Sequence, residues 1–411
     1  MALFLETEVA IVGAGPIGTL AAIQASKKND VVILEQRKTI GIPDHCAGLI
    51  SRTGLKKIGI DKLPDSVIQN DKVIGAKFYS PNGYNFKVKR NNTQAIVVDR
   101  ALFDQHLAKL AEQKEVNILR SCKVINLHFD KKQKKSFINY KTKFGNTSKL
   151  HTLASEVTIL AEGRTGRVAK SVGFSPPKKK YRLSGFQYLV ENVSELDPQF
   201  VEMYFSNKIS PGFFTWIIPI SDSAAKIGLA TNEKGAVSRL DYFMKKHPLV
   251  KYRFKKSKVL QKFGGEVIVS GLMNKTSTDG IMVAGDAAGQ TKATTGGGVI
   301  TGGMAGIIAG QIASKAIQEH NTTRRFLKNY DAQWKNVLRN QLKAMSLFRW
   351  LLNRLSDKAF DSAFKTAVSN QLDKMIEEKG DIDSQAEIIL SLLREPAVIK
   401  LAFRLLPHIQ F

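Results

Sequence analysis

Short apolar runs and one amphipathic segment alternate along the first part of the chain. The runs "VAIVG" and "VVILE" predict two buried strands, and the residues between them predict a helix from Pro16 to about Lys28. The later run "AIVVDR" predicts another strand, followed by a helix over 101–113. The apolar residues of that helix recur at helical spacing: Leu102, Phe103, Leu107 and Leu110. Strands that alternate with helices in this way are typical of a parallel α/β sheet.

The pattern changes in the middle of the chain. Between 171 and 270, short β-like runs follow one another, among them "LSGFQYLV", "VEMYF", "FFTWIIPI" and "AAKIGLA". An earlier segment, "KVIGAKFYSPNGYNFKVKR", predicts a hairpin, because 81–83 supply turn residues. The strand "VTILAEG" ends near Gly163, and "GIMVAGD" leads into a Gly/Ala-rich helix that reaches about Ile317. The α/β pattern therefore resumes after a β-rich insertion.

The predicted fold class is α/β, with a discontinuous Rossmann-like dinucleotide-binding domain, an inserted antiparallel sheet and a helical C-terminal region. The dinucleotide-binding domain is expected in three segments: 1–75, 99–170 and 271–320. The inserted domain is expected to combine the hairpin, 76–98, with the β-rich segment, 171–270. Residues 321–411 are helical in pattern and basic.

Charge is the unusual part of the composition. The 411 residues include 62 Lys and Arg but only 36 Asp and Glu, which gives a net charge of +26. Eight basic residues and no acidic residue lie between 245 and 262. Such a field favours nucleic acid, acidic substrates or an anionic lipid surface as partners. A solvated basic face explains the run equally well, and no nucleic-acid-binding motif accompanies it.

The C-terminal region contains one amphipathic stretch. Its apolar residues lie near one helical stripe: Trp334, Leu338, Met345, Phe348, Leu352 and Leu355. Its basic residues form a separate row: Lys335, Arg339 and Lys343. This pattern suits a helix that rests on an anionic membrane surface. It suits a helix packed over the dinucleotide-binding domain equally well.

The turn after the first strand carries the motif GxGxxG. Its first glycine makes the tight turn, its second lets the backbone approach a pyrophosphate, and its third lets helix and strand pack closely. Glu35 ends the next strand, about 20 residues further on, where a carboxylate binds a ribose diol. This spacing argues against a plain βαβ unit with incidental glycines. The predicted nucleotide-binding residues are Gly13, Gly15, Pro16, Gly18, Glu35, Gln36 and Arg37.

Three later segments favour FAD over NAD. The segment "VVDRALFDQHL" lies at a strand-to-helix junction, and "LAEGRTG" ends a strand. The third segment, "GIMVAGDAAGQTKATTGGGVITGGMAG", places an acid after a strand and three glycines before a helix. An acid there can accept a hydrogen bond from a ribityl hydroxyl, and the bare amides of a helix start can face the electron-rich edge of a reduced flavin. The predicted FAD-binding residues of these segments are Arg100, Gly163, Gly285, Asp286, Gly296, Gly297, Gly298 and Val299.

These motifs resemble those of FAD proteins with the p-hydroxybenzoate hydroxylase fold, over residues 5–320. Within that group the chain resembles the geranylgeranyl reductase family: "GIPDHCAGLIS" is similar to the family's CxG segment, and "PGFFTWIIP" to its aromatic-x-Trp-x-apolar-Pro signature. Two positions differ. Glu162 stands where the fold usually has Asp, and Phe214 where the family usually has Tyr, which removes a hydroxyl.

The resemblance implies a flavoprotein oxidoreductase of lipid biosynthesis. It would saturate C=C bonds of geranylgeranyl chains, in archaeal-type membrane lipids or their precursors, by hydride transfer from reduced flavin N5 and protonation. NAD(P)H, ferredoxin or a deazaflavin would supply the electrons, so an electron-donor protein is one candidate partner. The other expected partners are an isoprenoid lipid and an anionic membrane surface, and not nucleic acid. We expect a cytoplasmic protein, because the two cysteines give no disulfide framework. We also expect a monomer that is peripheral to the membrane, because its substrate would lie there.

The resemblance also places Cys46, Ala47 and Gly48 on the substrate face of the flavin. Either the Cys46 thiol or the neighbouring His45 would deliver the proton, or these are small residues that only fit against the ring. A metal site is not expected, because Cys46 and His45 are adjacent and no second ligand pair has suitable spacing.

Three residues of the second signature are expected to line an isoprenoid channel: Phe214, Trp216 and Pro219. Bare aromatic residues on a strand are also typical of a core.

Two other functions fit the same motifs. One is an FAD monooxygenase or halogenase, although "FTWIIP" lacks the first Trp of the halogenase segment Trp-x-Trp-x-Ile-Pro. The other is a non-catalytic prenyl-binding protein without flavin. Glu35, Asp286 and the late glycines argue against that loss.

Overall fold

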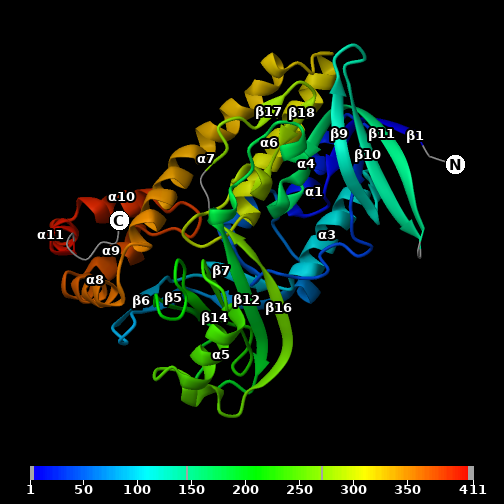
Figure 1. Ribbon diagram of the computed structural model, residues 1–411. Helices are drawn as coiled ribbons and strands as arrows, with labels where there is room; N and C mark the ends of the chain where they lie inside the picture. Colours follow the sequence, from blue (N-terminus) through cyan, green and yellow to red (C-terminus); the bar gives the residue numbers. More distant parts are fainter. Residues whose placement is uncertain (1–3, 145–146, 270–271, 406–411) are drawn as a thin grey trace.

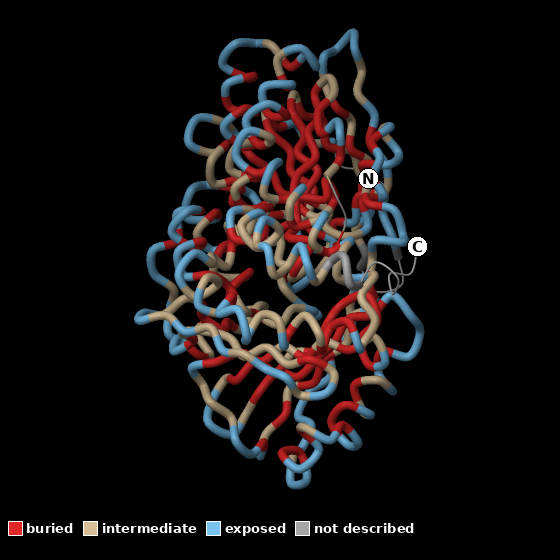
Figure 2. Tube along the Cα trace, turned by 90° about the vertical axis from the view of Figure 1, so that its left-hand side faces the viewer, coloured by how far each residue is buried: buried red, intermediate tan, exposed pale blue. Residues whose placement is uncertain are grey.

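The computed structural model describes residues 4–144, 147–269 and 272–405. Figure 1 shows a nucleotide-binding part with its helices at the top, a second sheet below it, and C-terminal helices beside both. The long helix α7 (Arg324–Leu352) connects the upper part to these helices. Buried segments are concentrated at the centres of the two sheet-containing parts (Figure 2).

The upper sheet has eight strands in the described part of the chain. Its parallel core has the order β18-β11-β1-β2-β8, with β17 antiparallel to β18 at one edge. An antiparallel extension, β9-β10, continues from β11. The strand bounds are β1 (Phe4–Val12), β2 (Val31–Leu34), β8 (Asn117–Leu119), β9 (Cys122–Asp130), β10 (Lys135–Phe144), β11 (Thr147–Leu160), β17 (Ser277–Thr278) and β18 (Ile281–Val283).

Alternate residues of the parallel strands enter two different cores. Val9, Ile11 and Ile33 pack under four helices: α1 (Pro16–Ala25), α3 (Arg100–Glu112), α6 (Val299–Gln318) and α7. Ala10, Val12 and their neighbours pack against β9, β10 and the short helix α4 (Arg167–Ser171). Both faces are covered, which explains the continuous apolar runs. The first helix ends at Ala25, earlier than the pattern predicted, because 26–28 form a turn.

The lower sheet has the order β16-β12-β15-β14-β13-β5-β6. Its strands are β5 (Gly75–Tyr79), β6 (Asn85–Lys89), β12 (Arg182–Glu191), β13 (Phe200–Tyr204), β14 (Thr215–Pro219), β15 (Ala225–Thr231) and β16 (Lys258–Ile268). The predicted hairpin is confirmed as β5–β6. The sheet is not wholly antiparallel, because β5 comes from an earlier chain segment and joins β13 in parallel. Helix α5 (Ala236–Lys246) covers one face.

A third, three-stranded sheet has the order β3-β7-β4. Its strands are β3 (Leu49–Ser51), β4 (Ile68–Val73) and β7 (Ala95–Val98), and helix α2 (Arg52–Lys57) follows β3. The sequence grouped 95–98 with the hairpin. The structure instead pairs β7 with β3 and β4, and its four apolar residues are all buried there. This sheet carries the end of the CxG segment.

The basic run between 245 and 262 is mostly exposed. Seven of its eight basic residues are exposed: Lys245, Lys246, Lys251, Lys255, Lys256, Lys258 and Lys262. The eighth, Arg253, is buried and forms an ion pair of 2.7 Å with Glu202. The Arg253 side chain therefore stabilises the lower domain and is not available to a partner.

The amphipathic stripe of α7 packs over the nucleotide-binding domain. Trp334 and Met345 are fully buried, Leu338 is nearly so, and the Trp334 indole donates a hydrogen bond to Thr276 Oγ1 at 2.8 Å. Phe348 packs against the same core, which also contains α6 and β18. Of the two interpretations of this stripe, the packed helix is the one observed. No helix in the described part of the chain is long and apolar enough to cross a membrane.

Four further helices follow: α8 (Asp357–Ser369), α9 (Leu372–Lys379), α10 (Ala386–Arg394) and α11 (Pro396–Leu405). They contact both other parts of the molecule. Asp361 of α8 accepts hydrogen bonds from Ser80 and Asn82 in the β5–β6 turn, and α10 packs against α7. The C-terminal region is thus built into the fold on both sides (Figure 1).

Candidate FAD site

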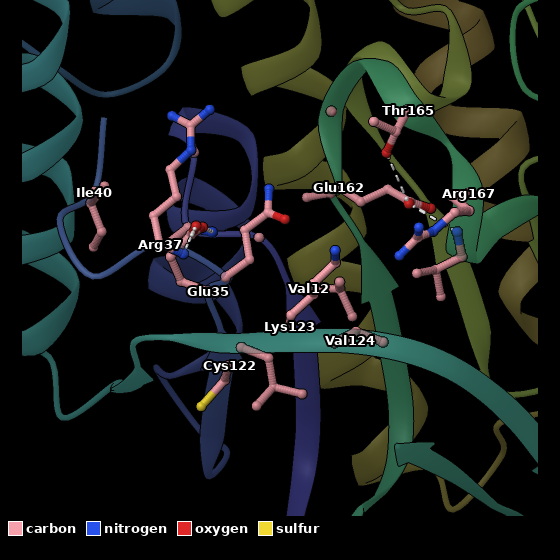
Figure 3. Close-up of a pocket in the computed structure, with 18 of the residues that line it drawn as sticks. Val12, Glu35, Arg37, Ile40, Cys122, Lys123, Val124, Glu162, Thr165 and Arg167 are labelled. Carbon is pink, nitrogen blue, oxygen red and sulfur yellow. Dashed lines mark hydrogen bonds between the residues drawn. The ribbon is translucent and has the colours of Figure 1, made fainter. Parts of the chain in front are cut away.

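A cavity of about 340 Å³ opens at the carboxyl ends of β1, β2 and β11. Seven predicted or neighbouring motif residues line it: Gly13, Ala14, Gly15, Glu35, Gln36, Arg37 and Gly163. In Figure 3, Glu35 and Arg37 lie on one side of this cavity and Glu162, Thr165 and Arg167 on another. This is the position in which doubly wound folds bind a dinucleotide.

The three glycines of the first turn have different surroundings. Gly13 has a φ of 104°, and a Cβ there would lie 2.6 Å from the Ala161 carbonyl oxygen. A Cβ on Gly18 would lie 2.0 Å from the Gly13 carbonyl oxygen. A Cβ on Gly15 would meet no protein atom within 4 Å. Gly15 lines the cavity at the start of α1, so it leaves space for a phosphate group at the helix N-terminus.

Glu35 is held in a fixed orientation at this cavity. Its carboxylate accepts hydrogen bonds from the backbone N–H groups of Ala14 and Arg37, each at 2.8 Å. Glu162 has a different role. It accepts hydrogen bonds from the N–H groups of Val168 and Ala169 at the start of α4. The exchange of Asp for Glu at 162 is therefore accommodated by an intramolecular bond that orders the cavity wall.

Several cavity residues were not predicted from the sequence, among them Ile40, Gly41, Asp104, Cys122, Lys123, Val124, Thr165 and Arg167. Cys122, Lys123 and Val124 open β9, which forms one wall (Figure 3). No local motif marks them, since β9 reaches the cavity only through its pairing with β10 and β11. Asp104 could have been predicted from the sequence, because it lies four residues after Arg100 on α3. The two side chains form an ion pair at 2.9 Å.

The residues predicted to bind the flavin half of FAD lie in the segment from Gly285 to Val299. A Cβ on Gly298 would lie 2.7 Å from Asp286 Oδ1, so the aspartate and the late glycines are in contact. Among the described residues, no donor forms a hydrogen bond with the Asp286 carboxylate. Burial raises the pKa of this carboxyl, and the charge of Arg100 opposes the shift. Helix α6 starts at Val299 without a side-chain cap. Both features fit a flavin with its ribityl chain.

The CxG segment is held by two side chains of the lower sheet. Gln187 Nε2 donates a hydrogen bond to the Cys46 carbonyl oxygen at 2.9 Å. The buried ammonium of Lys226 donates to the Val98 carbonyl oxygen at 3.2 Å and lies beside Gly48. The Gly48 N–H donates to Cys46 Sγ at 3.4 Å. Desolvation lowers the pKa of Lys226, and Asp44 and Cys46 oppose that shift, so Cys46 lies near a buried cation.

His45 lies differently from its neighbour. It is exposed, and its Cβ would be 3.1 Å from a Cβ on Gly265 of β16. Burial of its ring, together with Arg37 and Arg164, lowers the pKa of His45. A histidine that is neutral at neutral pH is a weak acid. Of the two candidate proton donors, Cys46 is therefore better placed.

The aromatic signature borders the late glycine turn. Phe213 and Phe214 precede β14, and their rings stack at a centroid distance of 4.2 Å. Trp216 meets Phe214 edge-on at 6.1 Å and is only half-buried. A Cβ on Gly296 would lie 3.7 Å from the Phe213 ring. Phe213 and Phe214 are buried in one hydrophobic cluster, against which Trp216 packs. These rings and the glycine turn therefore pack together, and we call this group the aromatic wall.

Pro219 does not belong to this wall. Strand alternation places Trp216 and Ile218 on one face of β14, and Ile217 and Pro219 on the other. The Pro219 carbonyl oxygen accepts a hydrogen bond from Asn70 at 2.9 Å. The sequence grouped Pro219 with the channel because it ends the motif, whereas its side chain is on the opposite face.

This fold and this site define an FAD-binding flavoprotein. The chain belongs to the FAD binding domain family, whose model matches residues 6–343, and within it to the geranylgeranyl reductase group. A digeranylgeranylglycerophospholipid reductase of Methanocaldococcus jannaschii is 30% identical over 396 residues, 96% of each chain. One of Methanococcus aeolicus is 29% identical, over 96% of this chain and 97% of its own length.

Solved structures show the same fold. A geranylgeranyl bacteriochlorophyll reductase-like protein of Thermoplasma acidophilum superposes with a TM-score of 0.85 at 24% identity, over 99% of this chain and 100% of its own. A flavin-dependent brominase superposes with a TM-score of 0.72 at 18% identity, over 97% and 98% of the two chains. The fold is thus shared by reductases and halogenases, and the site has to distinguish them.

Proposed function

We propose that this protein uses FAD to saturate carbon–carbon double bonds in the geranylgeranyl chains of a digeranylgeranyl glycerophospholipid or its precursor. The main support is the wall in which Phe213, Phe214 and Trp216 meet the late glycine turn. An alkene offers no hydrogen-bonding group, so its binding site needs apolar surface and little else. The names of the curated relatives agree with this substrate.

Different residues of this chain bind the cofactor, position the alkene and donate the proton. FAD, when bound, supplies the hydride. Gly13, Gly15 and Glu35 hold its nucleotide half, and Asp286 and the start of α6 hold its flavin half. The aromatic wall positions the alkene and excludes water. Cys46 lies where the CxG segment meets the lower sheet, and we assign to its thiol the proton for the second alkene carbon.

Lipid analysis tests this function directly. When the protein is co-expressed with a pathway that makes unsaturated digeranylgeranyl lipids, we expect a mass gain of two hydrogens for each double bond reduced. Extracts analysed by mass spectrometry identify the substrate and the extent of reduction. Unchanged lipids, together with NAD(P)H-dependent peroxide formation that a phenolic substrate stimulates, would support a monooxygenase instead. The residue at 214 is Phe, not the Trp of the halogenase segment, which disfavours that alternative.

We also propose that the last turns of α7 contact an anionic membrane. Leu347 and Trp350 are about half exposed, at 49% and 48%, and lie on the face of α7 opposite the buried Met345. The Arg354 guanidinium stacks 3.7 Å from the centroid of the Trp350 ring, and Lys343 precedes Leu347 by one turn. Apolar side chains flanked by cations are typical of interfacial contact.

Binding to lipid vesicles tests the membrane proposal. The Leu347→Ala/Trp350→Ala variant is expected to bind vesicles that contain phosphatidylglycerol at least about tenfold more weakly than the wild type, because it loses two apolar contacts. Wild-type binding should also weaken as salt rises, since exposed charges are screened. Leu150→Ala, another exposed leucine but on β11, is the matched control and should bind normally. Equal binding by both variants, or binding indifferent to salt and lipid charge, contradicts the proposal.

A further inference from the structure

Three residues shortly before the late glycines are bonded to the C-terminal region: Lys292, Ala293 and Thr294. The Lys292 ammonium forms an ion pair with Asp383 at 2.7 Å and donates to the Ile382 carbonyl oxygen at 3.1 Å. Thr294 Oγ1 donates to Gln385 Oε1 at 2.5 Å. The Arg349 guanidinium donates to the carbonyl oxygens of Ala293, at 3.0 Å, and Thr294. Helix α7 and the segment before α10 thus hold the turn from two sides.

Arg349 also reaches the aromatic wall. Its third hydrogen bond, at 3.3 Å, goes to the Gly212 carbonyl oxygen, directly before Phe213. Its guanidinium carbon lies 4.4 Å from the centroid of the Phe213 ring, in a cation–π contact. One side chain from α7 therefore connects the glycine turn to the aromatic wall.

The charge of Arg349 is not neutralised by the protein. Its side chain is buried, with 4% of the residue exposed, and its three acceptors are neutral carbonyls. Among the described residues, no carboxylate forms an ion pair with it. Arg253 and Lys292, which are also buried, each have an acidic partner. The buried Lys226 has no ion pair within the described part of the chain either, and its ammonium donates to the Val98 carbonyl oxygen. Burial lowers the pKa of Arg349 to about 9, so it is still protonated at neutral pH.

A buried cation without a counter-charge destabilises a protein unless something nearby offsets it. Helix α6 starts five residues after Thr294, at the same turn, and its N-terminus adds further positive potential. Both charges therefore point to a partner that gains negative charge at this place. A flavin gains electrons when it is reduced.

We propose that Arg349 is a positioning residue that fixes the late glycine turn and the aromatic wall together, and that its buried charge favours reduced over oxidised FAD. The inference rests on FAD binding, which the proposed function shares, and adds a role for the C-terminal region. The charge should act on the equilibrium between the two redox forms, and the hydrogen bonds should act on the binding of the lipid.

The test compares two variants that change charge at the same turn in opposite directions. Arg349→Met removes a positive charge and is expected to lower the preference for reduced FAD about tenfold, which lowers the two-electron midpoint potential by about 30 mV. Asp383→Asn removes the negative charge beside Lys292 and is expected to raise the potential, while the amide oxygen can still accept the Lys292 bond. Potentials are measured on the FAD-loaded full chain without lipid, by equilibration with redox dyes.

A third variant separates position from charge. Arg349→Lys keeps the charge but cannot make three hydrogen bonds to separate carbonyls, so its potential should stay near that of the wild type while the KM for the lipid rises. If Arg349→Met does not fold, Arg349→Gln replaces it, with the melting temperature of the apoprotein as the check. Shifts of the same sign in Arg349→Met and Asp383→Asn, or no shift in either, would overturn the charge effect. Loss of lipid reduction in a wild type that binds FAD would instead count against the proposed function alone.

Discussion

Replacing Gly15 with alanine is expected to remove most of the bound FAD while leaving the apoprotein as stable as the wild type. Gly15 has φ −70° and ψ 175°, which any residue adopts, and the added Cβ would touch no protein atom within 4 Å. The same Cβ would occupy space at the start of α1 where a phosphate group approaches the backbone. We expect at least about tenfold weaker FAD binding, or about 1.4 kcal/mol. Fluorescence titration of the apoprotein with FAD, together with its melting temperature, measures both quantities.

Gly18 is the matched control for this prediction. Its Cβ would lie 2.0 Å from the Gly13 carbonyl oxygen, so Gly18→Ala forces backbone to move and should destabilise the apoprotein by about 1–3 kcal/mol. The two alanines are three residues apart in one motif, yet they should affect different quantities. Full FAD occupancy in Gly15→Ala would show that the pyrophosphate does not approach this turn.

Cys46→Ala is expected to keep its FAD and to reduce the alkene at least about tenfold more slowly, the low end of what a positioned general acid contributes. The contact with Gln187 should persist, because Gln187 bonds to the Cys46 carbonyl oxygen and not to its thiol. The bond from the Gly48 N–H to Cys46 Sγ is lost in this variant. The Cys46 thiol should matter because Phe214 brings no hydroxyl to the aromatic wall. Single-turnover oxidation of the reduced enzyme by the lipid measures this step.

His45→Ala provides the comparison for Cys46. His45 is exposed and lies against Gly265 of β16, so its removal should slow the reaction much less than the loss of the thiol. The flavin spectrum of both variants checks that the cofactor is bound normally. An unchanged rate in Cys46→Ala would make Cys46 a packing residue, and a larger effect at His45 would assign the proton to the imidazole.

The cofactor motifs could be predicted because each is local. GxGxxG, Glu35 and Asp286 closely follow predicted strands, and the carboxyl ends of parallel strands meet at one edge of a sheet. The late glycines directly precede a predicted helix. The wall formed by Cys122, Lys123 and Val124 could not be predicted in this way. It depends on strand pairing between β9, β10 and β11, and the register of such pairs is set by tertiary packing.

The amphipathic stripe of α7 is a second feature whose packing partner could not be predicted from the sequence. Apolar residues at helical spacing require an apolar partner, but the pattern is the same whether that partner is a lipid or a protein core. In the structure, Trp334 packs against the nucleotide-binding domain, and the exposed apolar residues of α7 include Leu347 and Trp350 instead. Pro219 was misplaced for a similar reason, since a motif gives the order of residues but not the face on which each one lies.

The sequence by itself determined the class of cofactor, the glycine turns that receive it and the resemblance to isoprenoid reductases, because these depend on residue types at short spacing. Only the tertiary structure decided that the C-terminal region bonds to the segment before the late glycines, where Arg349 and Asp383 reach Lys292, Ala293 and Thr294. More than 50 residues separate these partners in the chain. Contacts over such separations are selected by burial and hydrogen bonding in the folded core, and no local pattern encodes them.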